Sequence, residues 1–218
     1  MLPGPPRECL PMLDTVLRDG LGHLPEPEAV TTVFRRTLGV IEADAAAAVD
    51  ALVQDLGLNV KPAYRWHYPY VDVRIDCPPD SAAELAKRLD EALGTWVVTS
   101  RERTAVQELA VLLDDRGLAL DVDDRVTGGR FTAELAAERQ TARTGTESGR
   151  IPVTLDATWD GGSPERRTGT VRLLCGVGDR AQEHTRELTV PNRGPEVAGY
   201  AGHFAAWTIV RRLTEETA

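Results

Sequence analysis

The 218-residue chain has few cysteines, few aromatic residues and no long apolar run. Its three cysteines, Cys9, Cys77 and Cys175, are widely spaced and form no C-x-x-C pair, which argues against a disulfide framework or a zinc site. No apolar stretch approaches the length of a membrane span. The opening residues MLPGPPRE have neither the basic nor the apolar part of a signal peptide. We therefore expect a cytoplasmic protein without a membrane anchor.

Positive charge is also scarce, because 25 Lys and Arg residues face 34 Asp and Glu residues and the formal net charge is −9. This balance opposes a chain-wide electrostatic footprint for nucleic acid. A local patch with Arg35, Arg36 and Lys61 leaves RNA binding open as a minor alternative. The histidines are scattered, and His203 is interpreted as a packing residue. The acidic residues lack the spacing of a calcium loop, so we predict no metal and no cofactor.

Hydrophobic periodicity predicts a mixed α/β chain. From Val30 to Ser100 the pattern is β-α-β-β-α-β, which is typical of an antiparallel sheet under one helical layer. Ser81, with Glu84 three residues later, predicts the N-cap of the second helix there. In this unit we expect strands at Val30–Thr37, Leu58–Tyr64, Tyr70–Cys77 and Trp96–Thr99, and a first helix at Glu42–Leu56. Beyond it we expect helices at Thr104–Arg116 and Gly194–Glu216, and strands at Ile151–Thr158, Gly169–Gly176 and Glu183–Val190.

The most informative stretch is Ala119–Phe131, ALDVDDRVTGGRF. It reads as an alternating strand, a Thr-Gly-Gly turn and the start of a helix that continues to Gln140. Backbone N–H groups at such a helix start can hold an anion or support a nucleophile. No Ser or Cys lies at the end of the strand, and Thr127 is interpreted as a helix cap. The corner therefore has the shape of a site without an obvious reactive group.

Stretches in fixed order along nearly the whole chain resemble the CinA family (competence/damage-inducible protein A), whose members include nicotinamide-nucleotide amidases. They match the family's N-terminal-domain loop, its G-I-G-E step, the start of its amidase domain, its T-G-I-A-G-P loop region and the residues before its closing helix. In order, these stretches are Leu2–Glu8, Gly39–Glu42, Leu112–Ala136, Val153–Val171 and Pro191–Arg193.

The resemblance implies three segments. Residues 1–27 would be a remnant of a molybdopterin-binding-like domain, residues 28–101 a KH-like connecting domain, and residues 102–218 a shortened, degenerate C-terminal amidase-like α/β domain. The predicted fold class is thus α/β (α+β), a KH-like β-α-β-β-α-β unit followed by that domain. The family's ADP-ribose pyrophosphatase activity is placed in the first domain, so we do not expect it here. Because the connecting unit has no GXXG loop, we interpret it as structural.

The resemblance fails at the chemistry. In the family pattern E-S-C-T-G-G the Ser is the nucleophile, and here the first three positions are Asp124, Arg125 and Val126. A guanidinium stays protonated and cannot attack a carbonyl. The family's Y-S-N-x-x-K segment, which supplies the Tyr and Lys that serve the nucleophile, has no counterpart, and Lys87 is the last lysine of the chain. We therefore predict no catalytic residues in this domain.

The family's binding loop is altered as well. Its T-G-I-A-G-P becomes the stretch from Thr154 to Trp159, in which side chains replace glycines that allow a phosphate to approach the backbone. Gly161 and Gly162 survive, but any hairpin turn would need them. The vestigial nucleotide-binding residues are then Asp124, Thr127, Gly128, Gly129, Gly161 and Gly162.

These observations favour a CinA-like protein related to nicotinamide-nucleotide amidases that has lost catalysis. It would be retained as a binding or regulatory protein, with a nicotinamide nucleotide as its ligand, or as a decaying paralogue. One alternative is residual nicotinamide-nucleotide amidase activity, and another is an RNA-binding KH-like module. Relatives of this family are typically dimers, so a homodimer is expected.

Overall fold

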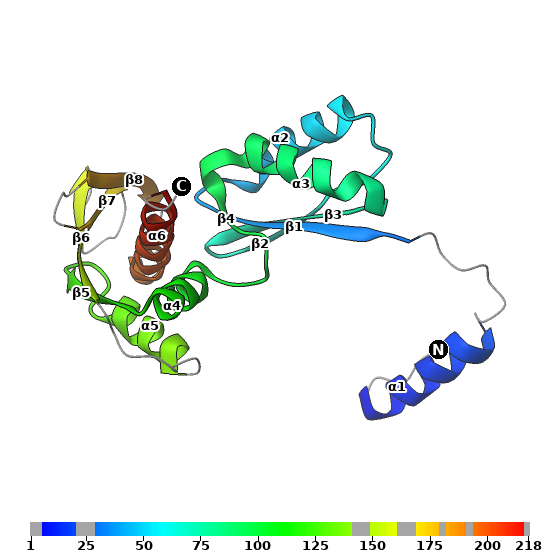
Figure 1. The fold of residues 1–218 in the computed structure, drawn as a ribbon, viewed down its shortest axis with the longest axis horizontal. Helices are drawn as coiled ribbons and strands as arrows, with labels where there is room; N and C mark the ends of the chain where they lie inside the picture. The colour runs from blue at the N-terminus through cyan, green and yellow to red at the C-terminus, as the bar shows by residue number, and fades with distance from the viewer. Residues whose placement is uncertain are drawn as a thin grey trace.

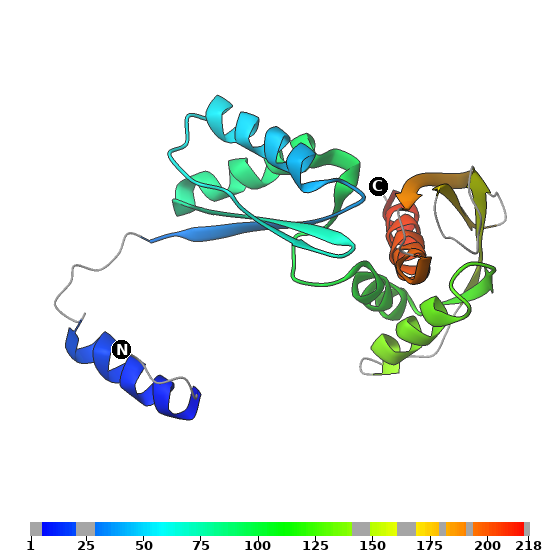
Figure 2. The same cartoon turned by 180° about the vertical axis from the view of Figure 1, so that it is seen from behind.

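The computed structural model describes residues 6–20, 29–140, 149–160, 169–178, 182–190 and 194–215. Within them the chain forms two four-stranded sheets, and Figures 1 and 2 show helices packed beside each sheet. The predicted α/β fold class is confirmed.

The first sheet belongs to a unit with the expected β-α-β-β-α-β order. Its strands are all antiparallel, in the order β2-β3-β1-β4, and α2 and α3 cover one face (Figure 1). Buried aliphatic residues such as Val49, Val73 and Leu85 fill the space between this face and the helices. The elements are β1 (Thr31–Leu38), α2 (Glu42–Asp55), β2 (Ala63–His67), β3 (Tyr70–Cys77), α3 (Pro79–Leu93), the 3₁₀ turn η2 (Gly94–Trp96) and β4 (Val97–Thr99).

Two local predictions in this unit are wrong. The first hairpin arm lies at Ala63–His67 rather than at Leu58–Tyr64, because the turn is shorter than expected and His67 pairs directly with Tyr70. The second helix begins at Pro79 and not beside Ser81, and its N-cap makes no side-chain hydrogen bond. Proline suits the first helical position because its φ is already helical and its missing N–H is not needed there.

The second sheet has the order β5-β6-β7-β8. β5 and β6 are parallel, and the other two pairs are antiparallel. The helices α4, α5 and α6 contact one another, and α6 lies against the sheet. The elements are α4 (Ala105–Arg116), β5 (Leu118–Asp124), α5 (Arg130–Gln140), β6 (Gly149–Asp160), β7 (Gly169–Val177), β8 (Gln182–Val190) and α6 (Gly194–Glu215).

The two units share buried contacts. Leu38 and Tyr70 belong to strands of the first sheet but pack into the core built by α4, α5, α6 and the second sheet. The Tyr70 hydroxyl accepts a hydrogen bond from the Ala105 backbone N–H at 2.8 Å and lies 2.9 Å from His203 Nδ1. Trp207 donates from Nε1 to the Val97 carbonyl at 3.2 Å. A buried polar connection therefore joins β3, α4 and α6.

Replacing Tyr70 by phenylalanine is expected to lower the free energy of unfolding by about 1–3 kcal/mol, because it leaves the buried Ala105 N–H without an acceptor. Urea denaturation followed by circular dichroism measures the change. Tyr64→Phe is the matched control, since its hydroxyl bonds the exposed Asp50 carboxylate at 2.8 Å. Equal losses in the two variants would contradict a special role for the buried hydroxyl.

The described N-terminal segment is a helix, α1 (Pro6–Thr15), followed by the π-helical turn η1 (Val16–Gly20). Figures 1 and 2 both show it apart from the two sheets. Four of its large apolar side chains are exposed: Leu10, Met12, Val16 and Leu17. No helix in the described part of the chain is long and apolar enough to cross a membrane.

Candidate functional site

The strand-turn-helix corner forms as the sequence predicts. β5 ends at Asp124, and α5 begins at Arg130. The backbone N–H of Arg125 donates to the Leu155 carbonyl of the parallel neighbour β6 at 2.9 Å, which holds the start of the turn to the sheet. Gly128 and Gly129 have φ values of +65° and +84°, a region that side-chain-bearing residues rarely adopt. The backbone conformation of the turn thus explains the Gly-Gly pair.

The Asp124 carboxylate occupies the donors of this corner. Its Oδ1 accepts from the backbone N–H groups of Val126 at 3.0 Å and Thr127 at 2.7 Å. Its Oδ2 accepts from the Gly129 N–H at 3.1 Å and from the Thr127 hydroxyl. The N–H groups that could have held a bound anion are therefore filled by an anion of the chain itself.

The pKa of Asp124 reflects this arrangement. Partial burial alone would favour the neutral acid, but the hydrogen bonds from Thr127, Val126 and Gly129 outweigh it and lower the pKa below its ordinary value. The carboxylate is therefore ionised at neutral pH and placed near the positive end of the α5 dipole.

Arg125, the first residue after β5, points its charge toward two acids. Its Nη2 lies 2.6 Å from Asp123 Oδ2 and its Nη1 lies 3.5 Å from Asp156 Oδ2. The Arg125 side chain is 63% exposed. It thus closes the surface of the corner with ion pairs on neighbouring strands and presents no group that could attack a carbonyl.

Thr127 acts as the predicted cap. The residue is buried, and its hydroxyl oxygen accepts the backbone N–H of Phe131 at 3.1 Å. This satisfies a donor of the first turn of α5. Asp124, Thr127, Gly128 and Gly129 are thus brought together, whereas Gly161 and Gly162 lie outside the described residues.

The role of Asp124 as an internal anion was missed by the sequence prediction. The sequence did contain a signal for it. Asp124 precedes Val126 by two residues and Thr127 by three, which is the spacing of an Asx motif, in which the carboxylate accepts from those backbone N–H groups.

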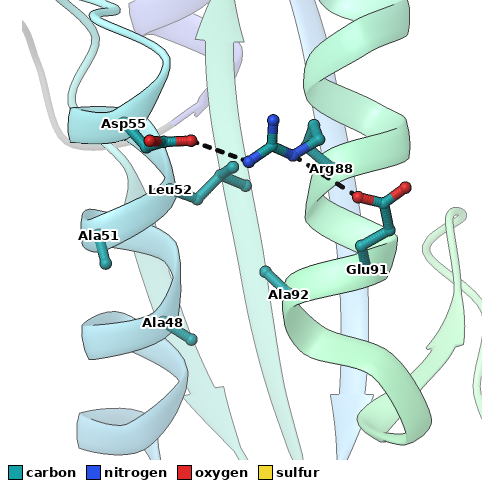
Figure 3. A pocket seen from close by; sticks show the side chains of 7 residues that line it. All are labelled: Ala48, Ala51, Leu52, Asp55, Arg88, Glu91 and Ala92. Atoms are coloured by element: carbon teal, nitrogen blue, oxygen red, sulfur yellow. Dashed lines mark hydrogen bonds and ion pairs between the residues drawn. The ribbon is translucent and has the colours of Figure 1, made fainter.

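A separate cavity of about 370 Å³ lies between α2 and α3 (Figure 3). Arg88 is the charged centre of its wall. The guanidinium lies 2.8 Å from Asp55 and 3.5 Å from Glu91, so two carboxylates already balance its charge. The remaining lining residues are Ala48, Ala51, Leu52 and Ala92. This groove contains no nucleophile, and the described part of the chain holds no cluster of His, Cys, Asp and Glu placed for a metal ion.

The arginines of the RNA alternative are not available at the surface. Arg35 and Arg36 are each 7% exposed. Arg35 binds both carboxylate oxygens of Asp90 at 2.6 and 2.7 Å. Arg36 binds those of Asp72 at 2.7 and 2.8 Å. Both guanidiniums thus serve the structure of the first unit.

Comparison with known proteins finds relatives that match part of the chain. No family model matches the chain. A CinA-like protein from Shewanella sediminis is 28% identical over 114 residues, which make up 50% of this chain and 26% of that protein. A CinA-like protein from Pseudothermotoga lettingae is 25% identical over 138 residues, 62% of this chain and 33% of that protein. The matched region therefore spans between about a quarter and a third of these curated relatives.

A solved formyltetrahydrofolate deformylase from Pseudomonas putida aligns with 84% of this chain and 93% of its own, at 7% identity and a TM-score of 0.25, a likeness too low to carry an argument. Four curated CinA-like proteins match the chain at 25–29% identity, which confirms its resemblance to that family.

Proposed function

We propose that this CinA-like protein performs no amidase chemistry at its corner and serves as a binding or regulatory protein. Amide hydrolysis of the family type needs a hydroxyl nucleophile with a base beside it, and hydrogen-bond donors for the oxyanion that forms. The carrying observation is that Asp124 occupies the hydrogen-bond donors of the turn. The family resemblance would also place Arg125, which is paired with Asp123, where the nucleophile belongs.

The ligand we propose is a nicotinamide nucleotide, as the family resemblance implies. Its phosphate would compete with the Asp124 carboxylate for the same N–H groups, so binding at the corner requires that side chain to move. Binding by the native chain is therefore expected to be weak unless the nucleotide uses other surfaces.

Incubation of the purified chain with nicotinamide mononucleotide is expected to release ammonia no faster than buffer alone. A CinA-family amidase assayed in parallel serves as the positive control. Arg125→Ser is expected to stay inactive, because a restored hydroxyl would still lack the Tyr and Lys of the family site. Ammonia release by the native chain would overturn the proposal and favour residual amidase activity. In that case Thr127→Val should abolish the activity, whereas Arg125→Ser should leave it unchanged.

The homodimer and the cytoplasmic location stay predictions. Light scattering coupled to size-exclusion chromatography measures the first, and cell fractionation measures the second.

A further inference from the structure

The helix α1 and its continuation η1 present an apolar face to solvent in the described structure. Leu10, Leu13 and Leu17 follow the spacing that places anchoring residues on one side of a helix. Leu10 is 63% exposed and Leu17 is 51% exposed. Met12 and Val16 widen the same exposed apolar surface. A contiguous apolar surface of this kind indicates a binding partner.

The groove between α2 and α3 is an apolar surface of a complementary shape. Its volume is about 370 Å³, and the buried side chain of Leu52 forms part of its floor (Figure 3). Ala48, Ala51 and Ala92 line its sides and are too small to fill it. Small side chains allow a third helix to approach, and a cavity of about 150 Å³ already accommodates a benzene ring. The groove therefore has room for leucine side chains of a docked helix.

The charged side chains beside both surfaces already have partners. At the groove, Arg88 lies 2.8 Å from Asp55 and 3.5 Å from Glu91. On the N-terminal helix, Arg18 forms an ion pair with Asp14, four residues earlier. Docking through the leucines would leave these five charges paired. It would therefore avoid the cost of burying a charge without its partner.

Within one chain, the exposed helix and the groove do not meet. Figures 1 and 2 show α1 on one side of the first sheet and the helices α2 and α3 on the other. A second copy can supply the missing half, because each copy offers one helix and one groove. Two identical contacts then close a two-fold dimer, and the exchange of one element between copies is a low-cost route to such a dimer.

We propose that α1 of one copy docks in the α2/α3 groove of a second copy, and that two such contacts hold a homodimer together. Each copy then covers the apolar side chains that its partner leaves exposed. The inference gives the expected homodimer a contact surface, and it does not depend on the proposed loss of amidase chemistry at the corner.

Light scattering coupled to size-exclusion chromatography of the full chain, over a range of concentrations, tests the proposal. We expect the native chain to dimerise, and Leu10→Glu and Ala51→Arg each to weaken the dimer by about tenfold or more, because each places a charge in an apolar contact. Both residues are exposed, so the variants keep their fold. Thr15→Glu, on the opposite side of α1, and Ala43→Arg, on α2 outside the groove, are the matched controls and should dimerise like the native chain.

Mixing the two weakened variants tests whether the helix and the groove contact each other. One contact of the mixed dimer is native, and in the other the introduced glutamate meets the introduced arginine. A dimer should therefore form in the mixture at concentrations where neither variant dimerises alone. The proposal is overturned if the native chain stays monomeric, if the four substitutions have equal effects, or if the mixture does not dimerise. A monomeric native chain would leave its own α1 or a different protein as the occupant of the groove.

Discussion

Replacing Asp72 by alanine is expected to lower the free energy of unfolding by about 3–5 kcal/mol, the usual cost of leaving a buried charge without its partner. Asp72 and Arg36 are 6% and 7% exposed and share two hydrogen bonds. His67 Nε2 lies 2.9 Å from the same carboxylate. The substitution would leave the Arg36 guanidinium enclosed by β1, β3 and the aromatic ring of Tyr70. Chemical denaturation measures the loss.

Two further variants separate the ion pair from general damage to the sheet. Asp76→Ala removes an exposed acid from the same strand and should leave stability close to that of the native chain. The double variant Arg36→Met with Asp72→Leu should recover most of the loss, because apolar residues of similar size often replace a buried pair without cost. Failure of the double variant to recover stability beyond Asp72→Ala would contradict the account.

The same carboxylate gives a pH dependence. Burial alone would raise the pKa of Asp72, but the hydrogen bonds and charge of Arg36, with the hydrogen bond from His67, hold it below its ordinary value. The pKa of Asp72 is thus lower in the folded than in the unfolded chain, where it is about 4. The stabilisation is therefore complete above that unfolded pKa and is lost as the pH falls through the folded pKa. The native chain is therefore expected to lose stability below about pH 4, and Asp72→Ala to lose less over that range.

Replacing Asp124 by alanine is expected to cost about 2–3 kcal/mol, because three backbone N–H groups and the Thr127 hydroxyl lose a charged acceptor at the start of α5. Asp123→Ala, at the preceding residue, is the matched control. The Asp123 and Arg125 side chains are both more than half exposed, so removing their ion pair should lower the free energy of unfolding by less than about 1 kcal/mol. Thermal denaturation of the two variants in the same buffer makes the comparison.

A small anion should restore part of what Asp124→Ala loses. Inorganic phosphate could enter the space of the deleted carboxylate and accept from the same N–H groups. We expect phosphate to raise the melting temperature of Asp124→Ala more than that of the native chain, while chloride at equal ionic strength does not. Equal responses of the variant and the native chain would mean that the corner cannot hold a free anion.

The fold could be predicted from the sequence where local patterns act alone. Alternation in Tyr70–Cys77 and the 3.6-residue periodicity of Ala105–Arg116 determine an element by themselves, and both appear with nearly those bounds. The errors at Leu58–Tyr64 and Ser81 concern the ends of elements. Several neighbouring residues could have begun or ended these elements. The pairing of His67 with Tyr70 decides where the hairpin arm ends, and Pro79 decides where α3 begins.

At the candidate site the sequence predicts the backbone better than the interactions. The Thr-Gly-Gly turn is specified by residues that few alternatives can replace, so it could be expected from the motif. The bonds of Asp124 depend on the direction of its side chain, and the burial of Arg36 depends on strands that are far apart in sequence. Neither follows from periodicity, because both result from tertiary packing.

The burial of two cysteines in the two cores makes thiol chemistry a reporter of unfolding. Cys77 and Cys175 are 1% and 0% exposed, and burial raises the pKa of the Cys175 thiol to about 12. Cys9, on α1, is only partly buried. A maleimide at neutral pH should therefore attach to Cys9 in the folded chain and to the other two only when a core opens, since the thiolate is the reactive form. The mass of the labelled chain then gives the number of cores that have opened, and peptide mapping of the labelled cysteine identifies which of the two has unfolded.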